Sequence, residues 1–184
     1  PVLATLVGAT MISESGAARL GLLVVAAVGL AAFFAPRLTV LASAAGLVAL
    51  VALAPVQGEI ADRTIPASAH RKLQDSHSRD RVDIWLAYGQ AIRAAPLLGS
   101  GFGSSATLHE HRVAQYLPEP KRIWLAVGHP HSAQVQLWVE TGLAGAALLL
   151  FAGLNLLVLI GGMPGVWRLA ALAAFAGALA IAAV

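Results

Sequence analysis

Long runs of apolar residues flank one polar stretch of the chain. Five runs carry no charged residue: 1–13, 20–36, 38–58, 141–167 and 169–184. A helix needs about 20 apolar residues, within a range of roughly 17–25, to cross the hydrocarbon core of a bilayer. The three central runs reach that length, and the two terminal runs read as truncated spans. The pattern therefore predicts an all-α, polytopic helical membrane protein.

The same pattern predicts three parts. Residues 1–58 hold a truncated span and two spans at about 17–36 and 38–58. Residues 59–130 form a long extramembrane loop. Residues 131–184 hold spans at about 132–160 and 165–184, the last one truncated. Because both ends of the chain lie inside apolar runs, we expect a fragment of a larger protein.

Composition supports a membrane protein and narrows the chemistry. The chain of 184 residues is 58% apolar and 11% charged, with a mean hydropathy of +0.77, whereas soluble domains are about a quarter charged. The absence of cysteine excludes disulfides and thiolate metal sites. The net charge of +3 is mild, but nine of the twelve basic residues lie between Glu59 and Pro130.

Two short links between apolar runs indicate the orientation. Pro36–Arg37 and residues 161–168 each carry one arginine and no acid. The positive-inside rule places such links in the cytoplasm, and long polar domains translocate largely regardless of their charge. The polar stretch is therefore predicted to face outward.

One amphipathic helix is predicted inside the polar stretch. It begins with Ser78 as its cap, has acids in its first turns and ends at Pro96. Its apolar face, lying against the membrane or the spans, comprises Val82, Trp85, Leu86, Gly89 and Ile92. Residues 99–105, "GSGFGSS", are predicted to be a flexible turn, and residues 106–130 irregular.

Arg81 is the first candidate for chemistry. It lies four residues before Trp85, so both side chains share a helix face. A guanidinium held over an indole is stabilised by roughly 0.5–2 kcal/mol and offers two donors to phosphate oxygens. The alternative is an interfacial arginine that touches lipid headgroups, with Trp85 anchored at the membrane surface.

Two other features are weaker. The amides of the glycine turn would suit a phosphate, but the turn lacks the strand and the lysine of a nucleotide loop, so a plain helix-terminating turn is favoured. The histidine pairs at 109 and 111 and at 129 and 131 lack the spacing of a helical zinc motif. Solvated loop histidines are favoured, and no metal is expected.

His131 stands out because it begins the fourth predicted span. Helical spacing places Gln134 on its face, together with Val135 and Trp138, while Gln136 and Glu140 form an i, i+4 pair on another face. Glu140 is expected to pack inward and bond a neighbouring span. A neutral imidazole at an outward-facing helix start is well placed to accept a proton from a hydroxyl.

These residues resemble a known family. "RVDIW" followed by "APLLGSGFG" and then "HPHSAQVQLWVETGLAG" is similar to the O-antigen ligase and polymerase family of bacterial membrane glycosyltransferases, with details closest to the ligase branch. The resemblance implies transfer of a glycan from a polyprenyl-diphosphate carrier to an acceptor hydroxyl on a lipid or polysaccharide. It also implies a periplasmic site in the inner membrane, no cofactor or nucleotide sugar, membrane lipids as neighbours and no nucleic acid.

The resemblance also assigns residue roles. Arg81 corresponds to the arginine that engages the diphosphate, and His131 to the essential histidine of the external loop. We expect substrate contacts from Arg79, Trp85, Arg19 and Gln134, and structural support from Gln136, Glu140 and Gly142. The family often has an S-x-S-R motif, but here Gly16 stands at the position of its arginine, with Arg19 three residues later. Ser132 stands where asparagine is commoner.

Other functions remain open at this stage. A polymerase would use another repeat unit as its acceptor. A transporter for an anionic solute would place ionisable residues near the bilayer midplane, where this chain has only Glu140, near one end of a span. A structural membrane segment that binds anionic lipid would make Arg81 and His131 dispensable.

Overall fold

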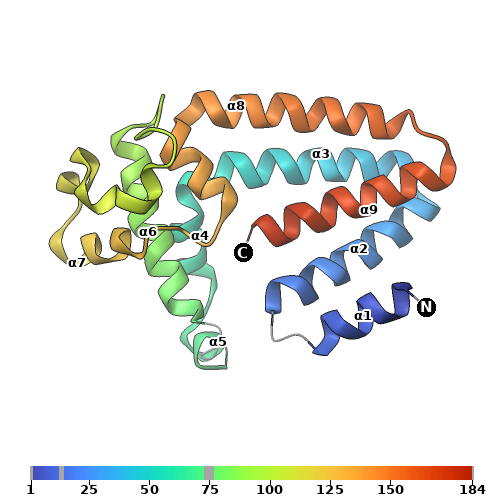
Figure 1. Cartoon of the computed structure of the whole chain (residues 1–184), viewed down its shortest axis with the longest axis horizontal. Coiled ribbons are helices and arrows are strands. Elements are labelled where there is room, and N and C mark those ends of the chain that lie inside the picture. Colours follow the sequence, from blue (N-terminus) through green and yellow to red (C-terminus); the bar gives the residue numbers. More distant parts are fainter. Residues whose placement is uncertain (1, 13–14, 73–76, 184) are drawn as a thin grey trace. The chain divides into compact units, whose positions relative to one another are not determined.

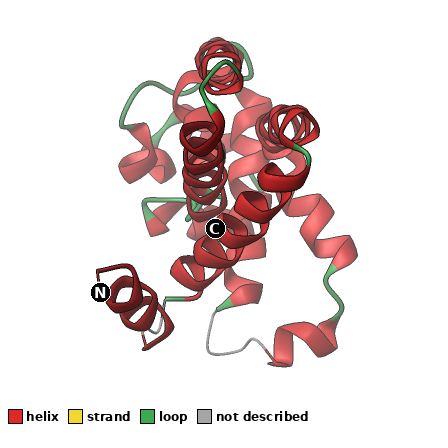
Figure 2. Cartoon of the chain, turned by 90° about the vertical axis from the view of Figure 1, so that its right-hand side faces the viewer, coloured by secondary structure: helices red, strands yellow, loops and turns green. Residues whose placement is uncertain are grey.

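A computed structural model of the chain describes residues 2–12, 15–72 and 77–183. In these ranges every regular element is a helix and there is no strand (Figures 1 and 2). Four helices are long and apolar enough to cross a membrane: Gly16–Phe34, Pro36–Thr64, Ala133–Gly161 and Gly165–Ala182. The predicted class of fold, an all-helical polytopic membrane protein, is confirmed. The predicted division into membrane spans and periplasmic loop stays a prediction.

The chain divides into two compact units, which are described separately. The first unit joins Pro1–Ala49 to Leu150–Val184, and the second unit is Leu50–Leu149. The first unit contains α1 (Val2–Ile12), α2 (Gly16–Phe34), α9 (Gly165–Ala182), most of α3 (Pro36–Leu53) and the later part of α8 (Ala133–Gly161).

Small residues let the helices of the first unit approach closely. A Cβ atom at Gly21 of α2 would meet Ile181 of α9, and one at Gly177 of α9 would meet Val25 of α2. Gly153 of α8 lies against Leu47 of α3 in the same manner. Such contacts replace the hydrophobic driving force that is missing between helices in lipid.

The second unit has a core of its own, built around α6. Its elements are η1 (Ala54–Val56), α4 (Gln57–Thr64), α5 (Ala67–Lys72), α6 (Ser78–Ala94), η3 (Ser104–Glu110), η4 (Arg112–Tyr116), α7 (Glu119–Arg122), η5 (Ile123–Val127) and the first part of α8. The stretch 106–130 is therefore a series of short helical turns. Leu108, Leu117 and Leu125 from these turns are fully buried beside Tyr88 of α6.

The helix predicted at residues 78–95 is present as α6, with two corrections. Its N-cap is His77, which has φ 50° and makes no capping bond. The Ser78 hydroxyl lies 3.0 Å from His70 Nδ1 instead, because a residue already inside the helix cannot cap it. The buried face also centres on Tyr88 and Ala91, in the protein core with Val135 of α8, and leaves Trp85 half-buried.

Two glycines bring the end of the second candidate span against α6. A Cβ atom at Gly58 would lie 2.5 Å from the Leu86 nitrogen, and one at Gly89 would lie 2.7 Å from the Pro55 carbonyl oxygen. Any larger residue would push the two segments apart. The close approach fixes the position of α6 relative to the start of α4.

Candidate active site

Trp85 ties α6 to the segment before α8. Its indole Nε1 donates a hydrogen bond of 2.8 Å to the carbonyl oxygen of Pro130. Among the aromatic contacts of the described residues, none joins Arg81 to Trp85. The predicted cation–π pair is therefore not formed by the described residues, and the indole N–H bonds Pro130 instead. Trp85 holds the histidine segment in place and is not the support of the Arg81 guanidinium.

Arg81 and Arg79 differ in their partners. Arg79 is exposed and forms ion pairs with Asp62 (2.7 Å) and Asp83 (3.1 Å). Its hydrogen bond to Asp62 is the main cause that raises the pKa of Arg79. Arg81 is half-buried and forms no ion pair with the described acids. Asp62 and Asp83 neutralise Arg79, so the structure gives no support to its expected contact with substrate. Arg81 remains available to bind an anionic ligand.

His131 lies before α8 and not within it. The helix begins at Ala133, and His131 has a left-handed backbone with φ 50°. Its ring packs edge-on against His129, with the ring centroids 4.0 Å apart. Non-glycine residues in this region are uncommon and carry strain that the surroundings must support. The turn projects an exposed imidazole from the end of a span, so the predicted shared helix face with Gln134 is wrong.

The electrostatics of His131 favour its neutral form. Desolvation of the ring lowers the pKa of His131, although the residue as a whole is exposed. The neighbouring charges of His129 and then Arg81 lower it further. Trp85, one helical turn after Arg81, bonds Pro130, the residue before His131, so the two segments meet at this point. The structure thus brings together a guanidinium and a neutral imidazole from segments 50 positions apart in the sequence.

Gln57 supports the turn that contains His129 and His131, which we call the histidine turn. Its Oε1 accepts hydrogen bonds from Gln134 Nε2 (2.9 Å) and the Ser132 hydroxyl (3.4 Å). Gln134 and Ser132 are 4% and 5% exposed. Gln134, expected to contact substrate, is therefore buried behind the turn and positions it. Sequence reasoning missed Gln57; its one signal is an uncharged polar residue directly after an apolar run that ends in Pro55 and Val56.

Trp138 completes the support by bonding the end of α3. Its Nε1 donates to the carbonyl oxygen of Val51 at 2.7 Å. In a continuous helix this carbonyl would accept from the residue four positions later, which here is Pro55 and has no N–H. The tryptophan satisfies an acceptor that the proline leaves free.

A backbone junction joins the glycine turn to α8. Gly142 has φ 60° and ψ −154°, which breaks the helix. On one side of the break, Val139 and Glu140 carbonyls accept from the amides of Ser100 (2.8 Å) and Gly101 (3.0 Å). On the other side, Leu143 and Ala144 donate to Pro96 (2.9 Å) and Leu97 (3.2 Å). Backbone hydrogen bonds hold the turn against α8, and the amides that form them are not free to bind phosphate.

The Glu140 carboxylate lies within this junction. It is 6% exposed and accepts from the amide of Gly103 (3.1 Å) and from Gln136 Nε2 (3.0 Å). The pair with Gln136 is the predicted one, and Glu140 packs inward. Its other partner is the glycine turn and not the neighbouring span that was expected, because Gly142 opens the helix at that level.

Arg19 belongs to the first unit, so its place in a site with Arg81 stays a prediction. It is exposed in the first turn of α2, whose N-cap Ser15 accepts from the amide of Ala18 at 3.2 Å. Ser13 and Glu14 of the S-x-S-R comparison lie outside the described residues. No group of three or more potential metal ligands occurs in the part of the chain that the structure describes.

A comparison with protein families decides the relationship of the chain. The family model described as "O-Antigen ligase" matches residues 1–150. The chain belongs to the O-antigen ligase family. This membership points to glycan transfer in O-antigen or polysaccharide assembly. No curated protein and no solved structure matches the chain.

The family match covers the whole histidine turn of this O-antigen ligase family member. Arg81, Trp85, Gln57 and His131 all fall inside it. Each of these residues makes or receives a contact that shapes the turn, apart from Arg81, whose charge acts on His131. The chemistry of the family therefore has a candidate location in the second unit.

Proposed function

We propose that this chain transfers a glycan from a polyprenyl-diphosphate carrier to an acceptor hydroxyl at the periplasmic face of the bacterial inner membrane. One arrangement carries the proposal: Trp85, one helical turn after Arg81, bonds Pro130, the residue before His131, and Arg81 has no acidic partner among the described residues. His131 stands two residues before α8, a helix long enough to span the membrane. A lipid-linked diphosphate would reside at that depth.

Arg81 would bind the leaving diphosphate. Negative charge develops on this group as the anomeric carbon–oxygen bond breaks, and a fixed guanidinium stabilises that charge. The planar fork of arginine matches two phosphate oxygens. Arg19 is proposed as a second contact with the donor, in place of the arginine that Gly16 replaces.

His131 would accept the proton of the acceptor hydroxyl. The hydroxyl oxygen attacks the anomeric carbon directly, the bond to the carrier diphosphate breaks, and the configuration inverts. Such general-base assistance contributes typically 10²–10⁴-fold, and it requires the neutral imidazole that the lowered pKa of His131 favours. The acceptor is a lipid for a ligase and another repeat unit for a polymerase.

The test uses the full-length protein in proteoliposomes with a polyprenyl-diphosphate-linked glycan and candidate acceptors, in the presence of a chelator. Release of the carrier diphosphate and the glycosylated product are both followed. We expect Arg81→Ala and His131→Ala to lower the rate at least a hundredfold. Lipid A-type and repeat-unit acceptors, supplied separately, distinguish ligase from polymerase activity.

Matched controls separate chemistry from folding. Arg112→Ala and His109→Ala change residues of the same types on η4 and η3 and should retain the wild-type rate. Equal rates in the wild type and both site variants would refute the assigned site. Uptake of the donor glycan into the vesicle lumen without any product would favour a transporter.

A further inference from the structure

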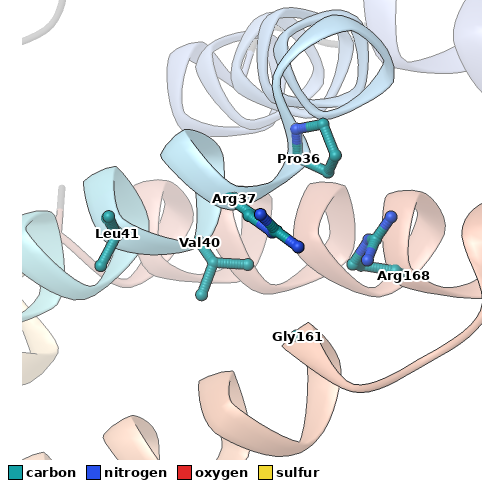
Figure 3. A pocket seen from close by; sticks show the side chains of 6 residues that line it. All are labelled: Pro36, Arg37, Val40, Leu41, Gly161 and Arg168. Carbon is teal, nitrogen blue, oxygen red and sulfur yellow. The ribbon is translucent and has the colours of Figure 1, made fainter.

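The two short links of the first unit meet at one cavity. The cavity has a volume of about 270 Å³ and is lined by Pro36, Arg37, Val40, Leu41, Gly161 and Arg168 (Figure 3). Arg37 comes from the first turn of α3 and Arg168 from the first turn of α9. Figure 3 shows both arginine side chains among the residues that line this cavity. Residues more than 130 positions apart thus place two positive charges together.

The described residues of the first unit include no acid that could neutralise these arginines. No aspartate or glutamate occurs in residues 15–58 or 141–184. Glu14, the one acid in the sequence of the first unit, lies outside the described residues. Two guanidiniums that line one cavity repel one another, so their arrangement favours an anionic ligand between them.

Apolar surface adjoins the charged cavity. A neighbouring hollow of about 330 Å³ shares Pro36 and Arg168 and is lined otherwise by apolar residues, including Phe33, Val166 and Leu169. Trp167, in the same turn as Arg168, is 69% exposed, as is typical of residues that anchor a helix at the membrane surface. A ligand with a phosphate and an acyl chain would match both parts.

We propose that Arg37 and Arg168 bind the phosphate of an anionic phospholipid, with an acyl chain against Phe33 and Leu169. α3 and α9 both begin at this cavity, so the positive ends of two helix dipoles add to the attraction. Basic pockets between membrane helices on the cytoplasmic side bind such headgroups. This site is separate from the proposed transferase function and does not depend on it.

The test measures lipid retention by the full-length protein. The protein is purified in a neutral detergent and offered phosphatidylglycerol or phosphatidylcholine, and bound lipid is counted by native mass spectrometry. We expect the wild type to retain phosphatidylglycerol preferentially. Each of Arg37→Gln and Arg168→Gln should weaken this preference about fivefold, and the double variant should abolish it. Arg112→Gln, outside the first unit, should retain the preference.

Competition with inorganic phosphate distinguishes a lipid headgroup from a free anion. If phosphate at millimolar concentration displaces the lipid completely, the site binds free phosphate and the lipid proposal is overturned. Equal retention of both lipids, or retention unchanged in the double variant, also overturns it. If the double variant does not fold, the single variant Arg168→Lys, which keeps the charge, decides the proposal. It should retain the preference that Arg168→Gln weakens.

Discussion

At the scale of single residues, the candidate site depends on how neighbouring groups set the protonation of His131. The ring is desolvated and stands beside His129 and Arg81, and all three effects lower its pKa. A histidine with a lowered pKa is neutral over more of the physiological range, as a general base requires. Because the folded pKa lies below the unfolded value of about 6.5, stability from this group is complete above that pH and falls as the pH drops through the folded pKa.

The first prediction concerns the acid limb of the pH–rate profile. Replacing His129 by alanine removes one cause of the lowered pKa of His131. The limb should therefore move to higher pH while staying below about 6.5, since desolvation and Arg81 remain. Transfer rates between pH 4.5 and 8 in the wild type and His129→Ala measure the shift. The control variant His109→Ala should leave the acid limb at the wild-type pH. An acid limb at the same pH in the wild type and His129→Ala would contradict the assignment of His131 as the general base.

The second prediction concerns Gln57, which accepts hydrogen bonds from both Ser132 and Gln134. Gln57→Ala should lower the free energy of unfolding by about 1–3 kcal/mol, because the buried Gln134 amide loses its acceptor. Displacement of the histidine turn should lower kcat about tenfold with little change in KM. Gln57→Glu keeps an acceptor and should recover most of kcat. An equal loss in both variants would point to packing alone, and Gln115→Ala serves as the control.

At the scale of elements, the segment before and within the glycine turn forms one junction with the break in α8 at Gly142. The segment 96–101 and the broken part of α8 exchange four backbone hydrogen bonds around Gly142. Helix breaks at membrane depth are tolerated where neighbouring groups satisfy the freed backbone. The junction holds the carboxylate of Glu140 against the glycine turn and fixes the first part of α8, which follows His131. Gly99 and Gly142 are therefore explained by the same close contact between the two backbones.

The third prediction tests this junction. In Gly142→Ala a Cβ atom would lie 2.5 Å from the carbonyl carbon of Leu97, at a φ and ψ that only glycine adopts readily. We expect a loss of about 3 kcal/mol or more in the free energy of unfolding. Hydrogen exchange at the amides of Ser100 and Gly101 should accelerate. Gly46→Ala, with no atom within 4 Å of the new Cβ, should be neutral or slightly stabilising, and similar behaviour of the two variants would contradict the role of the junction.

At the scale of the whole molecule, the order of the helices and links predicts which segments lie on the same side of the membrane. Four helices are long and apolar enough to span, and the links at residues 35 and 162–164 are the short ones. If α8 crosses the membrane, His131 and Gly162 lie on opposite faces. The proposed donor site and the proposed phospholipid site would then act on different leaflets.

The fourth prediction tests that orientation. Because the chain contains no cysteine, single cysteines can be introduced at Gln115, exposed on η4, and at Met163, in the α8–α9 link. A membrane-impermeant maleimide is added to cells whose outer membrane has been permeabilised. It should label Gln115→Cys and leave Met163→Cys unlabelled until the inner membrane is disrupted. Labelling of Met163→Cys alone, while the inner membrane is intact, would show that the topology is the opposite of the predicted one. Both variants should keep the wild-type transfer rate.

The sequence by itself determined the class of the protein. Apolar runs of bilayer length require helices, because no other open structure satisfies the backbone in lipid. The local spacing also located α6 and the pair of Gln136 with Glu140. The motifs around Arg81 and His131 pointed to the O-antigen ligase family, and the family match confirmed it.

Only the tertiary structure decided which groups meet. Helical periodicity cannot foresee that Trp85 turns to Pro130, since that bond joins residues 45 positions apart. It also cannot foresee that Gln57 lies beneath Gln134, or that the break at Gly142 is filled by the backbone of residues 96–101. Long-range hydrogen bonds depend on where a whole segment packs, whereas periodicity reports one face of one helix. The ion pairs of Arg79 with Asp62 and Asp83 were likewise visible only in the structure, because they depend on how α4 packs against α6.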